Sequence, residues 1–331
     1  NVHDYLQQMH REVFEGHDLI NVGEMSSTSL EHCIRYSKPA SKELSMTFNF
    51  HHLKVDYPNL QKWVRADFDF LELKRILSDW QTGMQAGGGW NALFWCNHDQ
   101  PRVVSRFGND GEYRAVSAKM LGTALHFLQG TPFVYQGEEL GMTNPGFDHI
   151  DQYRDVETLN IHRLQRDAGV NDADNMAAIM QKSRDNGRTP MHWNCEPNAG
   201  FSAGVPWIDV PANAAQINVA TQLDDADSVL HHYRQLIALR RHEALMSDGV
   251  YRQLLPEHPQ IWAYVREGAG ERLLVLNNFY GTPCEVELPD YVINETMAQR
   301  RVISNYPDCP PRHRQVSLRP YESFVLHLTN H

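Results

Sequence analysis

Acidic residues follow three short apolar stretches of the sequence, at the points where we expect buried strands to end. Glu24 closes the stretch DLINVGE, Asp99 closes ALFWCNHD, and Glu138 and Glu139 follow TPFVYQG. Cleavage of a glycosidic bond needs two carboxyl groups, one to protonate the leaving oxygen and one to attack or to activate water. Carboxylates from different strands of one parallel sheet can form such a pair, because the carboxyl ends of the strands lie on one rim.

The adjacent residues Glu138 and Glu139 are the weaker candidates for this chemistry. Neighbouring residues on a strand point to opposite faces of the sheet, so the two side chains would not face one substrate. We therefore expect this pair to be structural. Taken alone, the segment Asn97-His98-Asp99-Gln100 is better explained as a polar turn after a strand, and Pro101 helps to turn the chain away.

Strand and helix patterns alternate through the first three quarters of the chain. We expect strands over residues 18–24, 45–52 and 91–96, a strand that leads into a loop over residues 131–139, and helices over residues 4–14, 68–84, 115–130 and 227–245. This alternation is typical of β/α units that share a parallel sheet. A long polar excursion between Gly141 and Gly204 interrupts the pattern, and excursions of this length in compact enzymes are often functional loops.

The pattern changes at about residue 248. Short strand patterns such as YRQLL, IWAYVRE, RLLVLNNF and SFVLHL follow one another without a helix between them. They predict antiparallel β structure. We therefore divide the chain into a first domain over residues 1–247 and a C-terminal β-sandwich over residues 248–331.

Charge and cysteine content exclude several classes of partner. The chain has 331 residues, of which 30 are basic and 41 acidic, and its net charge is −11. It has no run of Lys and Arg. Nucleic acid and anionic membrane surfaces are therefore poor partners. No apolar stretch approaches the roughly 20 residues of a membrane span. Five scattered cysteines predict free thiols in a reducing cytoplasm; they stand at positions 33, 96, 195, 284 and 309.

Several longer motifs resemble those of the α-amylase superfamily, glycoside hydrolase family 13. They are VGEMSST, WNALFWCNHDQPRVVSRFG, FVYQGEELGMTN, QYRDVETLN and SRDNGRTPMHW, and together they cover essentially the whole chain. The resemblance is to the branch that contains oligo-1,6-glucosidases and trehalose-6-phosphate hydrolases, and FNFHHLKVDYP is more similar to the latter. It implies a retaining α-glucosidase with a (β/α)8 TIM barrel and a C-terminal antiparallel β domain. We expect no cofactor and no metal ligand set in this chain.

The resemblance also implies roles for individual residues. Glu24 matches the general acid/base of the family, and Asp99 matches the acid that stabilises the transition state. His98 matches a residue that binds sugar hydroxyls, and Arg184 matches an arginine at the far side of the non-reducing glucose. Because Glu24 must hold its proton near neutral pH, we expect its side chain to be buried beside another carboxylate.

One element of the family pattern is absent from this sequence. The covalent nucleophile of the family is an Asp in a GFRxD motif on the fourth barrel strand, and no such motif occurs here. The resemblance therefore implies that the chain supplies only the fifth to eighth β/α units. We expect it to work with the N-terminal half of the same polypeptide, because an open half barrel would leave its core exposed.

The resemblance implies a phosphorylated disaccharide as the substrate, and trehalose 6-phosphate would yield glucose and glucose 6-phosphate. The phosphate group of this substrate is a dianion, so we expect cationic side chains to bind it. The candidates are Lys54 and Lys62, which follow one predicted barrel strand. Weaker candidates stand in an adjacent loop, namely Arg35, Lys38 and Lys42. Two alternatives stay open: an oligo-1,6-glucosidase or related isomerase, which needs no phosphate pocket, and a non-catalytic relative.

Overall fold

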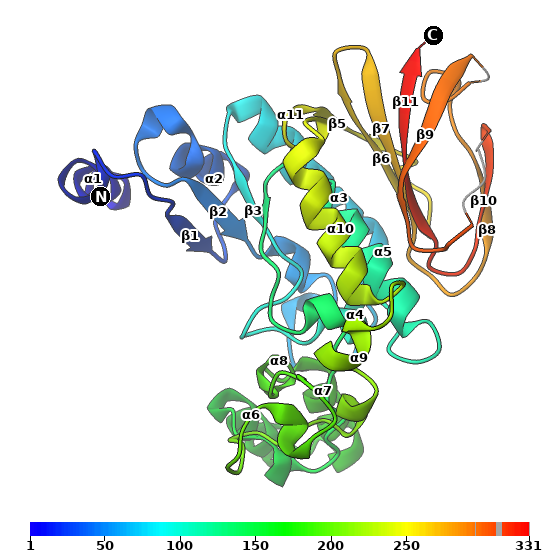
Figure 1. The fold of residues 1–331 in the computed structure, drawn as a ribbon. Coiled ribbons are helices and arrows are strands. Elements are labelled where there is room, and N and C mark those ends of the chain that lie inside the picture. The colour runs from blue at the N-terminus through cyan, green and yellow to red at the C-terminus, as the bar shows by residue number, and fades with distance from the viewer. Residues whose placement is uncertain (295, 309–312, 331) are drawn as a thin grey trace.

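A four-stranded parallel sheet forms the N-terminal part of the computed structural model, which describes all residues except 295, 309–312 and 331 (Figure 1). The strands run in the order β1 (Val22–Met25), β2 (Met46–Asn49), β3 (Asn91–Leu93) and β4 (Thr131–Pro132). Glu24 pairs with Phe48, and Phe48 pairs with Ala92. Sequential parallel neighbours of this kind, with helices between them, form half of a (β/α)8 barrel.

Helices connect the parallel strands, and their ends follow from the local sequence. They are α2 (Leu30–Ser37), α3 (Phe70–Gly87), α4 (Val103–Phe107) and α5 (Arg114–His126). Asp69 begins α3, because its side chain accepts a hydrogen bond from the amide of Glu72. Gly88 ends α3 with a φ of 74°, a conformation that glycine adopts without strain.

The excursion after β4 forms a separate helical lobe, drawn in green in Figure 1. Its helices are α6 (Val156–Asp167), α7 (Asp172–Lys182), α8 (Asp185–Arg188) and α9 (Val219–Leu223). Two small apolar cores stabilise the lobe, one around Leu140 and Met191 and one around Phe147 and Ile179. The chain then returns to the barrel through α10 (Val229–His242), which packs on α5.

Antiparallel strands make up the C-terminal part of the chain. After α11 (Leu245–Asp248), a five-stranded sheet contains β5 (Val250–Leu254), β6 (Ile261–Gly268), β7 (Glu271–Asn278), β11 (Ser323–Asn330) and β9 (Met297–Ser304), in that order. A two-stranded sheet pairs β8 (Cys284–Glu287) with β10 (Gln315–Leu318). The predicted β-sandwich over residues 248–331 agrees with this change of sheet type, and the domain boundary itself stays a prediction.

Both faces of the five-stranded sheet are covered, as β6 illustrates. Trp262 and Tyr264 pack with the helices of the barrel, and the Tyr264 hydroxyl donates to the carbonyl of Ala124 at 2.8 Å. Ile261 and Ala263 point the other way, into the core shared with the two-stranded sheet. A strand that is buried on both faces needs a continuous apolar run, which explains the sequence IWAYV.

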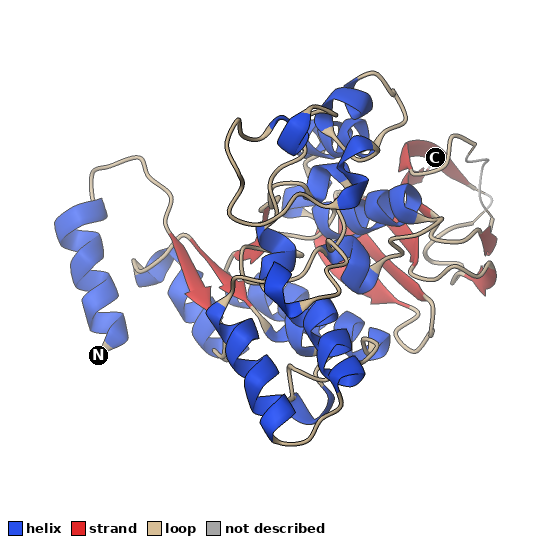
Figure 2. Ribbon diagram, turned by 90° about the horizontal axis from the view of Figure 1, so that it is seen from below, coloured by secondary structure: helices blue, strands red, loops and turns tan. Residues whose placement is uncertain are grey.

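Two predicted elements differ from the structure. The strand predicted at the start of residues 131–139 is short, because pairing with β3 ends at Pro132. The loop that follows turns at Gly137, which has a φ of 85°, into a short 3-10 helix at Glu138–Leu140. The helix predicted over 4–14 is α1 (Val2–Met9) followed by a π-helical turn (His10–Phe14). Figure 2 shows α1 at the side of the molecule, beyond β1, and Tyr5 on it is 69% exposed.

In the described part of the chain, no helix combines the length and the apolar character that crossing a bilayer requires.

Candidate active site

A pocket of about 240 Å³ lies at the carboxyl ends of the four parallel strands. Glu24 comes from β1 and Phe48 from β2, while His98 and Tyr135 come from the segments that follow β3 and β4. Its other lining residues are Phe50, Phe94, Cys96, Asn97, Phe133 and Val134. Each of the four β/α units therefore supplies part of the wall. A carboxyl and an imidazole group beside aromatic rings suit a sugar, which presents both hydroxyls and apolar faces.

A second pocket of about 570 Å³ adjoins the first and shares Phe50 with it. It contains four of the residues predicted from the sequence, namely Lys54, Lys62, Asp99 and Arg184. Its remaining lining residues are Ser26, Leu53, Tyr57, Gln100 and Glu157. The loops after β2 and β3 and the helical lobe after β4 meet here, so residues far apart in the sequence form one polar site.

Asp99 is the centre of a charged network in the second pocket. Its carboxylate lies 2.7 Å from Nη2 of Arg188 and 3.6 Å from Nη1 of Arg184. Nε of Arg188 also donates to the carbonyl of His98 at 2.8 Å, which fixes the backbone beside the carboxylate. The side chain of Asp99 is 37% exposed, so a ligand can reach it.

Asp155 forms ion pairs with the same two arginines that contact Asp99. Nη2 of Arg184 lies 2.5 Å from the Asp155 carboxylate, and Nη1 of Arg188 lies 3.4 Å from the same oxygen. Burial opposes ionisation of this carboxyl, but hydrogen bonds from Arg184 and Thr158 outweigh the burial and lower the pKa of Asp155. The buried Asp155 carboxylate thus anchors both guanidinium groups that contact Asp99.

The two proposed phosphate-binding lysines have different surroundings. Nζ of Lys54 donates to the carbonyl of Ser26 at 3.2 Å. Among the described residues, no carboxylate forms an ion pair with Lys54, whereas Lys62 has one. Nζ of Lys62 donates to both oxygens of Glu157, at 2.9 and 3.0 Å. Nε of Arg184 lies 3.3 Å from Glu157 as well, so this carboxylate occupies the position that an anionic ligand would need.

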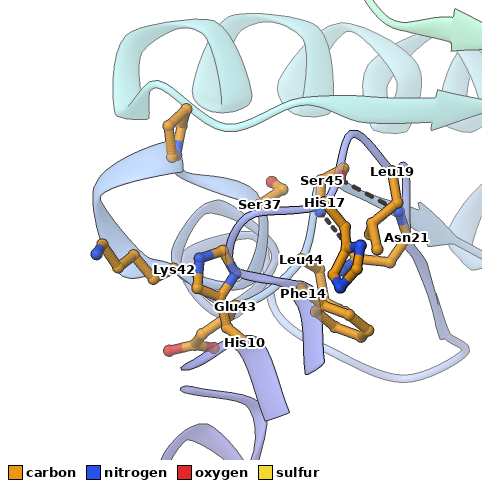
Figure 3. A pocket seen from close by; sticks show the side chains of 11 residues that line it. His10, Phe14, His17, Leu19, Asn21, Ser37, Lys42, Glu43, Leu44 and Ser45 are labelled. Carbon is orange, nitrogen blue, oxygen red and sulfur yellow. Dashed lines mark hydrogen bonds between the residues drawn. The ribbon is translucent and has the colours of Figure 1, made fainter. Parts of the chain in front are cut away.

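The weaker candidates for phosphate binding are not brought to these pockets. Lys42 lines a different pocket of about 390 Å³ near the π-helical turn and pairs with Glu15 at 3.4 Å (Figure 3). Arg35 pairs with the buried Glu43 at 3.6 Å, and Lys38 is exposed at the end of α2. The pocket in Figure 3 shares no lining residue with the other two.

One expectation about the predicted acid was wrong. Glu24 is exposed in the structure, whereas we expected a buried side chain beside another carboxylate. Glu24 and His98 line the first pocket, and Asp99 lines the second, although Nε2 of His98 lies only 3.5 Å from Asp99. The predicted pair of acids therefore faces two adjoining hollows that Phe50 separates.

Glu138 is buried under the first pocket and lines none of the three pockets described above. The Tyr233 hydroxyl donates to one of its oxygens at 3.0 Å, and Sγ of Cys96 donates to the other at 3.4 Å. Burial raises the pKa of Glu138 to about 7. These contacts support the predicted structural role, but the physical reason differs, because Glu138 and Glu139 lie on a 3-10 helix and not on a strand.

Sequence reasoning missed three members of the charged network: Arg188, Asp155 and Glu157. All three stand inside the motifs SRDNGR and QYRDVETLN, which were singled out as wholes. The motifs were the available signal, but nothing in the sequence showed which of their charged residues would meet Asp99.

Comparison with known proteins identifies the family. The family described as "Alpha amylase, catalytic domain" matches residues 1–249, and "Alpha-amylase SusG C-terminal domain" matches residues 261–325. The chain belongs to the α-amylase family. The resemblance predicted from the sequence motifs is thereby confirmed, and so is the barrel fold with a C-terminal antiparallel region.

Relatives within the α-amylase family include two trehalose-6-phosphate hydrolases. That of Bacillus subtilis (strain 168) is 54% identical over 99% of this chain, and that of Escherichia coli (strain K12) is 51% identical over 97%. An oligo-1,6-glucosidase of Halalkalibacterium halodurans is 45% identical over 98%. These matches cover 57–58% of the relatives, so the chain spans just over half of their length.

A solved structure agrees with the same placement in the family. The crystal structure of trehalose-6-phosphate hydrolase from Bacillus licheniformis superposes with a TM-score of 0.96 at 55% identity. The superposition covers 99% of this chain and 59% of that one.

Proposed function

We propose that the chain forms part of a retaining α-glucosidase that hydrolyses trehalose 6-phosphate to glucose and glucose 6-phosphate. The observation that carries this proposal is the second pocket, which Lys54 and Lys62 line together with Asp99 and Arg184. A phosphorylated disaccharide combines a dianion with sugar hydroxyls, and this pocket offers cations for the first and a carboxylate with a guanidinium for the second. The relatives named trehalose-6-phosphate hydrolase support the same choice.

In the proposed reaction, Glu24 protonates the bridging oxygen and later removes a proton from water. Asp99 stabilises the positive charge that develops on the sugar ring, because a fixed carboxylate lowers the energy of an oxocarbenium-like state. Arg184 and Arg188 hold the Asp99 carboxylate in place through their ion pairs with it. The attacking carboxylate is a further group, and no residue of the two pockets is matched to it. We further propose a cytoplasmic protein, since the described cysteines, Cys33, Cys96, Cys195 and Cys284, are free, while Cys309 lies outside the described residues.

A binding experiment tests the proposed substrate without requiring the complete reaction. Calorimetric titration of the protein with trehalose 6-phosphate and with trehalose should show preference for the phosphorylated sugar. Replacing Lys54 or Lys62 by Ala should weaken only the phosphorylated ligand, by about tenfold, because each lysine offers a charged hydrogen bond. Lys42→Ala is the matched control, since that lysine lines another pocket. Equal affinity for both sugars would rule out the proposed substrate.

An activity assay separates the proposal from the oligo-1,6-glucosidase alternative, which the H. halodurans relative keeps open. Release of glucose 6-phosphate from trehalose 6-phosphate is compared with release of glucose from isomaltose. The assay is run on two proteins. One is this chain, and the other is a fusion of this chain to the part of the B. subtilis relative that has no counterpart in the match. Cleavage of isomaltose alone would assign the alternative function.

A further inference from the structure

Three charged side chains are buried together beside the second pocket. The Asp56 carboxylate lies 2.6 Å from Nη2 of Arg106 and 2.6 Å from Nζ of Lys182, and each of the three side chains is at most 2% exposed. Burial opposes ionisation of Asp56, but the two cations outweigh it and lower its pKa. Burial lowers the pKa of Lys182 to about 8, although the Asp56 carboxylate opposes this shift.

Each of these residues belongs to a different segment that forms a wall of the second pocket. Asp56 lies between the lining residues Lys54 and Tyr57 on the segment after β2. Arg106 lies on α4, which follows the segment with Asp99 and Gln100, and Lys182 ends α7 just before Arg184. One buried carboxylate therefore joins three walls that are far apart in the sequence.

Further contacts extend from this cluster to the lining residues themselves. Nη1 of Arg106 donates to the Gln100 side chain at 2.8 Å, and Nη2 of Arg106 donates to the carbonyl of Leu53. The Tyr57 ring, which lines the pocket, has Nζ of Lys182 at 5.3 Å from its centre and the guanidinium carbon of Arg106 at 5.8 Å. Both buried cations thus lie close to the Tyr57 ring, which forms part of the pocket wall.

Stabilisation alone does not account for such a cluster. Bringing three charges out of water is costly, and apolar side chains of similar size stabilise a core at least as well. Two cations and one carboxylate also leave a net charge of +1 next to the pocket, and Lys62 in the pocket acts electrostatically on Lys182.

We propose that Asp56, Arg106 and Lys182 are positioning residues of the second pocket, which hold its three walls at the spacing that an anionic sugar phosphate requires. This inference rests on the proposed function for the identity of the ligand. The three residues line none of the pockets described above, and they act through the lining residues Lys54, Tyr57, Gln100 and Arg184.

The test compares Lys182→Met and Asp56→Asn with the control Lys119→Met. Lys119 is also a buried lysine, 4% exposed, and it pairs with Asp227 at 2.8 Å without lining any of the three pockets described above. Amide hydrogen exchange of the ligand-free proteins is measured over residues 51–57, 97–100 and 183–188. Calorimetry then gives the dissociation constants for trehalose 6-phosphate and trehalose.

We expect Lys182→Met to accelerate exchange in all three segments and to weaken binding of the phosphorylated sugar by about tenfold, with trehalose changed by less than about twofold. Lys119→Met should do neither. Unchanged exchange in the three segments overturns the inference, and so does an equal loss for both sugars. Asp56→Asn raises the local positive charge while breaking the cluster, so tighter phosphate binding in that variant would show that charge and not position matters.

These outcomes are separate from a failure of the proposed function. If the unmodified protein binds both sugars equally, the proposed substrate is wrong. The exchange measurement still shows whether the cluster holds the three segments together, because it requires no ligand.

Discussion

Two regions of the molecule differ in the groups that their cations contact. Where the barrel helices meet the five-stranded sheet, Arg266 donates to the carbonyls of Phe127, Met246 and Gly249, at 2.7 to 3.1 Å. Nζ of Lys74 donates there to the carbonyls of Leu255, His258 and Ile261, at 2.7 to 3.3 Å. At the second pocket, by contrast, three cations face carboxylates: Lys62 faces Glu157, while Arg184 and Arg188 face Asp99 and Asp155. Lys54 is the exception, because its Nζ donates to the carbonyl of Ser26.

This difference separates cations that support the fold from cations that can bind a ligand. A backbone carbonyl cannot leave its cation without moving the chain, and a buried carbonyl without a donor costs free energy. A carboxylate on a partly exposed side chain can move aside, so an incoming anion can replace it. Composition does not distinguish the two cases, because both regions use the same residue types.

The largest expected effect comes from removing Arg266. Arg266→Met leaves several buried carbonyls without a donor, and we expect the free energy of unfolding to fall by about 3 kcal/mol. Urea denaturation measures this change. Arg252→Met is the control, because Arg252 is 50% exposed and should cost less than about 1 kcal/mol. Similar losses for the two variants would contradict the distinction between the regions.

The packed region should also respond to acid through its buried histidines. Burial lowers the pKa of His232 to about 3, and Nε2 of His232 lies 2.8 Å from the Thr123 hydroxyl. Below pH 6.5, His232 binds a proton in the unfolded chain but stays neutral in the folded chain. The free energy of unfolding therefore falls as the pH drops below 6.5. At pH 5 this one histidine should account for about 2 kcal/mol of the loss relative to pH 8.

His232→Gln should remove that part of the acid sensitivity, which urea midpoints at pH 8 and pH 5 measure. A variant that loses stability between these pH values as steeply as the unmodified protein would show that His232 is not responsible.

A substitution in the pocket should change binding more than stability. Arg184→Lys keeps the charge but loses the planar guanidinium that contacts Asp99, Asp155 and Glu157 together. We expect binding of trehalose 6-phosphate to weaken by about tenfold while the free energy of unfolding changes by less than about 1 kcal/mol. Calorimetry and urea denaturation on one preparation make the comparison. A large loss of stability would place Arg184 with the structural cations.

The smallest effect should come from the exposed pairs on α3. Arg75 lies 2.6 Å from Glu72 and 2.7 Å from Asp79, yet its side chain is 58% exposed. Replacement by Gln should change the free energy of unfolding by less than about 0.5 kcal/mol, because water screens exposed pairs. A larger change in thermal unfolding would mean that counting ion pairs predicts stability better than burial does.

Much of the fold could be predicted from periodicity. Strand and helix patterns gave the order of the β/α units and the start of the antiparallel region, because apolar spacing reflects burial. The extent of β4 could not be predicted, because residues 133–135 are apolar enough for a strand but pairing with β3 ends at Pro132. Apolar spacing also did not show that α1 leaves Tyr5 exposed, since the covering of a face depends on what packs against it.

The candidate site could be predicted one residue at a time, but its pairings could not. Family motifs indicated Asp99, Arg184 and Lys62 separately. Glu157 contacts both Lys62 and Arg184 because the helical lobe folds back onto the barrel. Lys62 and Glu157 are 95 residues apart in the sequence. Long-range contacts of charged side chains leave no periodic signal in a sequence.

The first pocket takes one part of its wall from each of four β/α units. Such a wall is modular. A change in the length or sequence of one loop replaces one side of the cavity and leaves the other three sides, and the sheet below them, as they were. Variation confined to single loops would therefore be enough to redirect this scaffold from one ligand to another, without any new fold having to arise.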